Sequence, residues 1–99
     1  MNTVQLRRYQ ILHGEMDAYV EWWRHSVLPI REQYGFDVLF AFVDESTNQF
    51  VWAVTHDGDF DEAERIYMNS PERAAASLRH GEIFISKVAV VHQGWRDTA

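Results

Sequence analysis

Hydrophobic positions recur along this chain with two different periods, and the order of those periods predicts the secondary structure. Residues 3–12 alternate as a strand does, and Gly14 ends that segment. From Glu15 to Tyr34 the apolar residues recur every three or four positions, which is the pattern of a helix with one buried side. The members of that stripe are Met16, Val20, Trp23, Val27, Ile30 and Tyr34. The charged residues between them, Arg31 included, are expected to face water.

Pro29 and Gly35 mark two particular points of this helix. Pro29 removes one backbone hydrogen bond and clashes with the carbonyl of His25, so we expect a kink there. Because the apolar stripe continues in register to Tyr34, we do not expect a break. Gly35 is expected to cap the end of the helix.

Two strands, two helical segments and a last strand are expected in the remaining chain. Strands 36–43 and 50–55 flank a polar turn at 44–48. A helix capped by Asp59 or Asp61 follows, and Ser70-Pro71-Glu72 begins a second helical segment that His80-Gly81 ends. The residues of the first of these helices expected to face inward are Phe60, Ala63, Ile66 and Tyr67. The last strand is placed at 82–92, and the tail 93–99 is expected to fray or to cover a neighbour.

This order of elements predicts one α+β domain over residues 1–99. It is the β-α-β-β-α-β arrangement of a ferredoxin-like sandwich, in which helices cover one face of a four-stranded antiparallel sheet. The open face should then be polar, yet the middle and last strands are apolar on both sides. A bare apolar face of that size exceeds what monomers normally leave exposed, so we expect a homodimer that packs sheet against sheet. The pattern leaves open which of the two alternating sets of strand residues faces the partner, because a one-residue bulge exchanges the two faces of a strand.

Composition narrows the class of protein further. A net charge of −6 with 9 Lys and Arg argues against nucleic-acid partners and against docking on anionic membranes. The absence of cysteine excludes thiolate chemistry and Cys-type metal sites. The N-terminal residues lack the features of a signal peptide, and the apolar runs are too short to span a bilayer. We therefore expect a soluble, cytoplasmic domain.

Several short motifs occur in an order that points to a known family. They are Arg7-x-Tyr9-x-Ile11 before Gly14, Trp23-Arg24 with Val27-Leu28-Pro29, Tyr34-Gly35-Phe36, Asn48-x-Phe50-Val51-Trp52, and Ser70-Pro71-Glu72. Together they cover about residues 3–92 and resemble the NIPSNAP-type family, although His13 stands where that family would have proline. The resemblance implies a dimeric α+β barrel. That superfamily includes cofactor-free monooxygenases, isomerases, cyclases and haem enzymes, but the resemblance implies no catalytic residues.

Metal and cofactor chemistry find little support in the residues. The five histidines are scattered, and no two share a helix face or a strand face at ligand spacing. Asp57-Gly58-Asp59-x-Asp61 has its glycine misplaced for a calcium loop, and its carboxylates are better explained as helix caps. We therefore expect no metal and no cofactor.

The aromatic residues give the most specific functional hypothesis. Arg7, Tyr9 and His56 are the candidate catalytic residues: Tyr or His would carry a proton, and Arg7 would stabilise an enolate or a carboxylate. The candidate substrate-binding residues, which share the gap between sheet and helix, are Trp23, Tyr34, Trp52 and Tyr67. Such walls suit a flat, weakly acidic organic ligand, a phenol, enol or lactone. The alternative is that these aromatic residues only fill the core.

Three functions remain open at the level of sequence. The first is a small cofactor-independent isomerase, cyclase or monooxygenase that acts on an aromatic or polyketide-like molecule. The second is a non-catalytic homodimeric binding or scaffold protein. A haem-dependent enzyme ranks last, because no histidine is convincingly placed as an axial ligand. A fully packed gap between sheet and helices would favour the second function.

Overall fold

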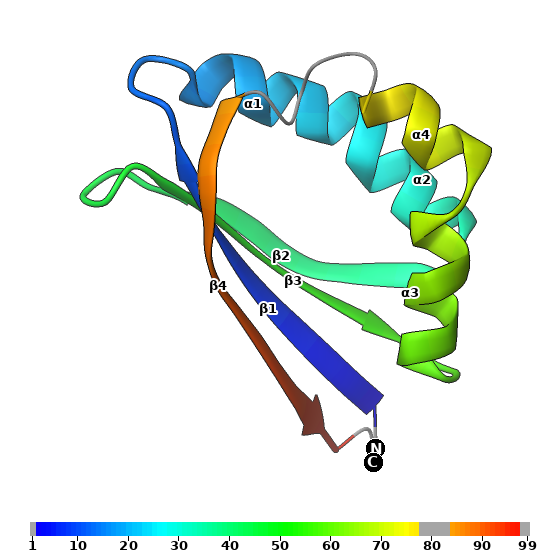
Figure 1. Cartoon of the computed structure of the whole chain (residues 1–99). Helices are drawn as coiled ribbons and strands as arrows, with labels where there is room; N and C mark the ends of the chain where they lie inside the picture. Colours follow the sequence, from blue (N-terminus) through cyan, green and yellow to red (C-terminus); the bar gives the residue numbers. More distant parts are fainter. Residues whose placement is uncertain (1, 78–83, 98–99) are drawn as a thin grey trace.

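The computed structural model describes residues 2–77 and 84–97, and its elements follow the α+β order that the sequence predicts (Figure 1). The elements are β1 (Asn2–Ile11), α1 (Met16–Trp22), the π-helical segment η1 (Trp23–Val27), α2 (Leu28–Gln33), β2 (Phe36–Asp44), β3 (Gln49–His56), α3 (Phe60–Met68), α4 (Pro71–Ser77) and β4 (Ile85–Arg96). The expected helix end at His80-Gly81 and strand start at Glu82 lie outside the described residues. Within the described chain, no helix is both long enough and apolar enough to cross a membrane.

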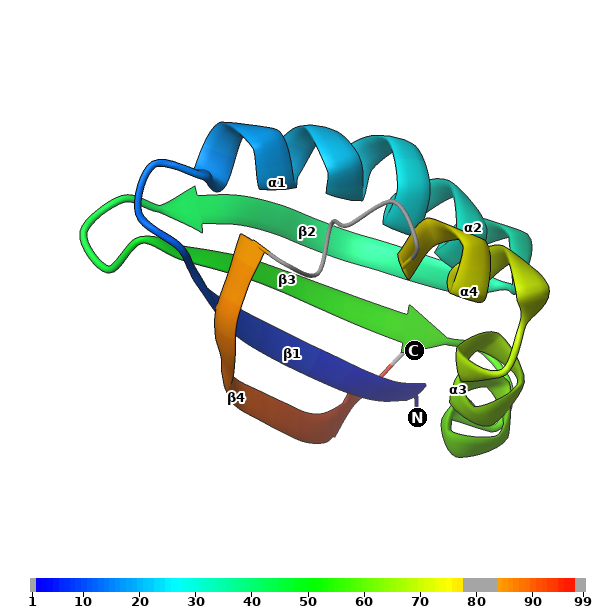
Figure 2. The same ribbon diagram turned by 45° about the horizontal axis from the view of Figure 1, so that its top comes forward.

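The sheet has the strand order β2-β3-β1-β4, and each neighbouring pair is antiparallel. All the helices lie on one face of this sheet, with α1, η1 and α2 forming one long rod and α3 and α4 beside it (Figures 1 and 2). The two ends of the described chain lie close together because Asn2 pairs with Arg96. The expected tail at 93–96 is therefore part of β4 rather than frayed, since β1 offers it a hydrogen-bonding partner.

The register of β1 on β3 sets which residues face the helices. Arg7 lies opposite Trp52, and Tyr9 lies opposite Phe50. Because side chains alternate along a strand, these residues and Val54 share the face that the helices cover. Tyr9, Phe50, Trp52 and Val54 are all buried in the core there. The candidate aromatic residues of the two central strands thus face the helices.

A bulge in β2 changes which of its residues face away from the helices. The register shifts between Val38 and Phe40. After that shift Phe40 and Phe42 lie opposite Ala53 and Val51, on the face without helices. Their side chains are 45% and 51% exposed and stack on each other, with ring centroids 5.8 Å apart. The open face therefore presents two large aromatic rings.

The long helix contains a π-helical turn immediately before Pro29. The Leu28 N–H donates to the carbonyl of Trp23, five residues earlier. A π turn tolerates the missing N–H of Pro29 without ending the helix, because the ladder is already wider than in an α-helix. The extra residue also rotates the helix after it, and Arg31 is consequently buried at 3% exposure. The expectation that Arg31 faces water is wrong for this reason.

The expected caps are present, whereas one expected inward residue points outward. Gly35 has a positive φ of 86°, as the end of the helix requires. Asp59 Oδ1 accepts a hydrogen bond from the Glu62 N–H at 3.1 Å, and Ser70 Oγ accepts from the Arg73 N–H at 3.2 Å. Ile66 is 46% exposed, so its assignment to the inner face of α3 is wrong. The inner face of α3 is instead defined by Phe60 and Tyr67, which are both buried.

Candidate functional site

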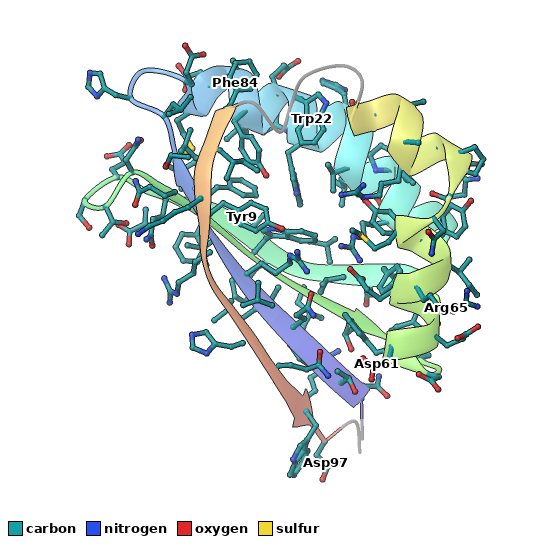
Figure 3. The ribbon with its side chains drawn as sticks, viewed as in Figure 1. Tyr9, Trp22, Asp61, Arg65, Phe84 and Asp97 are labelled. Carbon is teal, nitrogen blue, oxygen red and sulfur yellow. The ribbon has the colours of Figure 1, made fainter. Side chains whose placement is uncertain are left out.

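A cavity of about 380 Å³ lies between the helix-facing side of the sheet and the helices. Figure 3 shows Tyr9 of β1 and Trp22 of the long helix in this space. Side chains from the sheet and from the helices line it. The arginine and aromatic side chains that give the cavity its charge and its flat walls include Arg7, Tyr9, Trp52, Trp23, Arg31 and Tyr67. The gap between sheet and helices is thus not fully packed.

Most of the candidate residues from the sequence meet at this cavity, and two do not. Arg7, Tyr9, Trp23, Trp52 and Tyr67 all line it. The other two candidates, Tyr34 and His56, instead border a second hollow beside α3. There the Tyr34 hydroxyl donates to Glu72 Oε2 at 2.7 Å, and His56 Nδ1 accepts from the Gly58 N–H at 2.9 Å. His56 is therefore not placed to exchange a proton with a molecule in the main cavity.

Arg7 and Tyr9 form a connected pair on β1. The Arg7 Nε–H donates to the Tyr9 hydroxyl, and Nη1 donates to the side-chain oxygen of Gln5. The Gln5 amide donates in turn to the Gln93 side chain of β4 at 3.3 Å. The guanidinium also lies 5.6 Å from the ring centroid of Trp52. These contacts fix the direction of the guanidinium, and they place a cation against a phenolic oxygen.

A second, more deeply buried cation lies beside the first. Arg31 donates through Nη1 and Nη2 to the two carboxylate oxygens of Glu64, a bidentate pair. Its guanidinium carbon is 3.9 Å from the ring centroid of Tyr67, 4.8 Å from that of Phe36 and 5.3 Å from that of Trp52. Three aromatic rings and one carboxylate thus hold this charge in the interior.

Tyr67 is kept in its neutral form by its surroundings. Burial raises the pKa of its hydroxyl, while the positive charges of Arg31 and Arg73 oppose that shift only in part. A phenol with a raised pKa is protonated at neutral pH. Tyr67 can therefore donate a hydrogen bond to an oxygen in the cavity.

The cavity is positively charged although the chain as a whole is acidic. Its lining includes Arg7, Arg31, Arg73 and Lys87, and no carboxylate side chain lines it among the described residues. The whole chain carries a net charge of −6. A positively charged recess with apolar walls concentrates field lines and favours an anion over a cation.

Three buried hydrogen-bond donors on residues that line the cavity have no acceptor in the described part of the chain. The indole N–H groups of Trp23 and Trp52 and the Nε–H of Arg31 are buried and find no acceptor within the described chain. The Trp23 and Trp52 rings meet edge to face, with centroids 5.4 Å apart. A flat apolar molecule with oxygen acceptors would complement the cations and phenolic hydroxyls of the cavity lining.

Sequence reasoning did not find Arg31, Glu64 or Tyr19 as members of this region. Tyr19 is 1% exposed and lines the cavity. One signal was available for Glu64, which follows Phe60 by four residues and precedes Tyr67 by three and so shares their helix face. No comparable signal existed for Arg31, because its burial depends on the π turn.

The fold and the cavity define a ferredoxin-like α+β protein with an internal recess between sheet and helices, and solved structures share this architecture. A NIPSNAP family protein of Agrobacterium tumefaciens is similar with a TM-score of 0.78 and 16% identity, over 95% of this chain and 90% of that chain. A NIPSNAP domain protein of Burkholderia xenovorans gives a TM-score of 0.73 and 18% identity, over 98% and 94% of the two chains.

A Chloroflexus aurantiacus protein named as a candidate antibiotic biosynthesis monooxygenase gives a TM-score of 0.77 and 12% identity, over 100% of this chain and 96% of that chain. No protein-family model matches the sequence, and no curated protein matches it. At these identities the similarity establishes the fold, which is the fold of NIPSNAP proteins over nearly the whole chain.

Proposed function

We propose that this chain is a small cofactor-independent enzyme that acts on a flat, anionic, aromatic or polyketide-like molecule held in the cavity. The observation that supports this most strongly is the combination of aromatic walls with arginine and lysine side chains, without a carboxylate among the described lining residues. Aromatic walls favour a flat apolar body, and the cations favour an enolate, a phenolate or a carboxylate on it.

The proposed chemistry is a proton transfer between the ligand and Tyr9. The Tyr9 hydroxyl accepts a hydrogen bond from Arg7. Tyr9 would give its proton to a carbon of a bound enolate, which becomes a neutral ketone, and Arg7 would stabilise the phenolate left on Tyr9. The phenolate would then take a proton from another carbon of the ligand, which restores the Tyr9 hydroxyl and forms an enolate again. The same guanidinium would stabilise negative charge that develops on a ligand oxygen. Tyr67, which lines the cavity from α3 and is neutral at physiological pH, would donate to that oxygen. Isomerases, cyclases and cofactor-free monooxygenases that act on a carbon next to a carbonyl can each proceed through such a stabilised enolate.

Two further points support an enzyme rather than a purely structural protein. The gap between sheet and helices holds a cavity, whereas a structural role would be compatible with a closed core. One of the structural relatives, from Chloroflexus aurantiacus, is named as a candidate antibiotic biosynthesis monooxygenase. We also propose that the protein is a homodimer, with the face that carries Phe40 and Phe42 covered by a second copy.

The experiment that tests the proposed binding uses one anionic probe and its neutral counterpart. Isothermal titration with 1-hydroxy-2-naphthoate should give saturable binding, and 1-hydroxy-2-naphthamide should bind much more weakly. Arg7→Met should weaken binding of the carboxylate about tenfold or more, which corresponds to the loss of one hydrogen bond to a charged group. Arg8→Met is the matched control, because Arg8 is the next residue of β1 and points to the other face of the sheet. Equal binding of the two probes, or equal losses in the two variants, would contradict the proposal.

A further inference from the structure

We propose that Glu64 is a specificity-determining residue that acts as an internal counter-ion and makes the cavity select ligands with a single negative charge. The inference rests on the proposed function, since it concerns the charge of the ligand that the same cavity holds. Glu64 itself does not line the cavity, but it contacts both of the arginines that are best fixed there.

Arg31 cannot be the residue that receives the charge of a ligand. It is 3% exposed, lies against three aromatic rings, and shares two hydrogen bonds with Glu64. Removing a buried guanidinium from its carboxylate leaves both charges uncompensated in the interior. The Arg31–Glu64 pair is therefore expected to stay intact when a ligand binds.

Arg7 keeps most of its charge available. Its Nη1 lies 3.9 Å from Glu64 Oε1, outside hydrogen-bond distance, and its side chain is 17% exposed. Its hydrogen bonds to Tyr9 and Gln5 are to neutral oxygens, and its Nη2 donates to no residue in the described part of the chain. The guanidinium of Arg7 is thus the cation that a ligand anion can reach.

Arg7, Arg31 and Glu64 together carry two positive charges and one negative charge, a net charge of +1. Arg73 and Lys87 add positive potential to the same cavity, and they remain constant in every comparison below. One ligand carboxylate or enolate would neutralise the net charge of the group. A second negative charge on the ligand would approach Glu64 and be repelled by it. Without Glu64 the same site would accept a dianion.

The test compares a monoanion, 1-hydroxy-2-naphthoate, with a dianion, naphthalene-2,3-dicarboxylate, in four forms of the full chain. Glu64→Gln keeps an oxygen that can accept from Arg31 and removes the negative charge. It should raise the affinity for the dianion relative to the monoanion about tenfold. The double variant Arg31→Met/Glu64→Gln restores the net charge to +1 and should return the ratio to that of the wild type. Glu62→Gln is the control on the same helix, and the ratio should not change. Glu62 pairs with Arg65, which Figure 3 shows on the outer side of α3.

The outcomes separate this inference from the proposed function. If the wild type binds neither probe, both proposals fail. If the wild type binds the monoanion and Glu64→Gln leaves the ratio of dianion to monoanion affinity unchanged, only the role of Glu64 is overturned. A double variant whose ratio differs from that of the wild type also overturns that role. If Glu64→Gln does not fold, the double variant is compared with Arg31→Met alone. The inference then requires that the added Glu64→Gln change raises the affinity for the dianion relative to the monoanion about tenfold, and an unchanged ratio between these two variants contradicts it.

Discussion

At the scale of single residues, the most unusual feature of the core is the buried positive charge of Arg31. Arg31 is nearly inaccessible to solvent, and its charge is compensated by one carboxylate and by the faces of aromatic rings, Tyr67 at 3.9 Å being the nearest. The contribution of such a pair depends on both partners being present, because one partner alone is a desolvated charge. The partly buried Glu64 is therefore required to keep the charge of Arg31 in the core.

Glu64→Ala should destabilise the fold by about 3 kcal/mol, because it leaves the buried guanidinium of Arg31 without a counter-charge. Urea denaturation followed by tryptophan fluorescence measures this change. Glu62→Ala should leave the free energy of unfolding nearly unchanged, since its pair with Arg65 is exposed. Similar losses in the two variants would show that Arg31 is not held by Glu64.

Tyr9→Phe should lower turnover about 100-fold on the first substrate that the protein is found to convert, because the proposed proton carrier is lost. Binding of 1-hydroxy-2-naphthoate should change much less, since the ring of Tyr9 remains. His56→Ala should leave turnover unaffected, because His56 borders the second hollow and bonds its own loop. A steady-state assay that found the opposite order of effects would restore His56 as the proton carrier.

The bond between Tyr34 and Glu72 makes stability depend on pH. The Tyr34 hydroxyl donates to Glu72, and this bond lowers the pKa of Glu72 below its ordinary value of 4.5. A carboxyl whose pKa is lower in the folded state stabilises the fold above its ordinary pKa, and that contribution is lost as the pH falls through the folded pKa.

Tyr34→Phe should therefore weaken the fold at neutral pH, and the difference from the wild type should shrink as the pH falls below about 4.5. Urea denaturation at a series of pH values measures the free energy of unfolding of the wild type and of the variant, which gives one curve for each protein. Curves that stay parallel down to strongly acid pH would show that Tyr34 does not act through the ionisation of Glu72.

At the scale of elements, side-chain caps stabilise the first turns of α3 and α4, the two helices that complete the cavity wall. Ser70 begins α4, and α4 brings Arg73 and Ala76 to the cavity wall. Ser70→Ala should cost about 1 kcal/mol of stability and should also weaken binding of the anionic probe, because the first turn of α4 loosens. Asp59→Ala, which removes the cap of α3, should cost a similar amount with less effect on binding. Equal effects of the two variants on binding would indicate that α4 does not shape the cavity.

The regular elements could be predicted from sequence, whereas the π turn in the long helix and the bulge in β2 could not. The strands and caps follow from local patterns: Gly35, Asp59 and Ser70 each occupy the expected position. The π turn at Trp23–Val27 and the bulge after Val38 each add one residue to a regular element. Because both depend on how the finished layers pack, a periodicity count misses them.

These two irregularities explain the main differences between the predicted and the observed site. The π turn brings Arg31 inward, where it pairs with Glu64, so this buried charge could not be deduced from the apolar stripe. The bulge turns Phe40 and Phe42 to the open face. The apolar stripe places Tyr34 on the inner face of the helix but does not show which end of the gap between sheet and helices it reaches. The predicted strand ends at Thr55, so the pattern gives no position for His56, and neither residue could be assigned to the second hollow.

At the scale of the whole molecule, the open face of the sheet determines the assembly we propose. Phe40 and Phe42 lie there as a stacked, half-exposed pair above the small residues of β3. Phe42→Glu should convert a dimer into a monomer at micromolar concentration, because a buried unpaired charge would oppose association. Sedimentation velocity measures this. Ile66→Glu, at a site 46% exposed on α3, should leave the dimer intact. A wild type that sediments as a monomer would contradict the assembly.

The most direct measurement of ligand binding in the cavity follows the four tryptophan indole N–H signals in a ¹H–¹⁵N NMR titration. Trp22, Trp23 and Trp52 line the cavity, whereas Trp95 is 66% exposed on β4 and serves as an internal control. Adding 1-hydroxy-2-naphthoate should shift the first three signals along one saturating curve and leave the signal of Trp95 in place. The same titration with 1-hydroxy-2-naphthamide should produce much smaller shifts. Shifts confined to Trp95, or no saturable shift with either probe, would contradict an anion-binding cavity between the sheet and the helices.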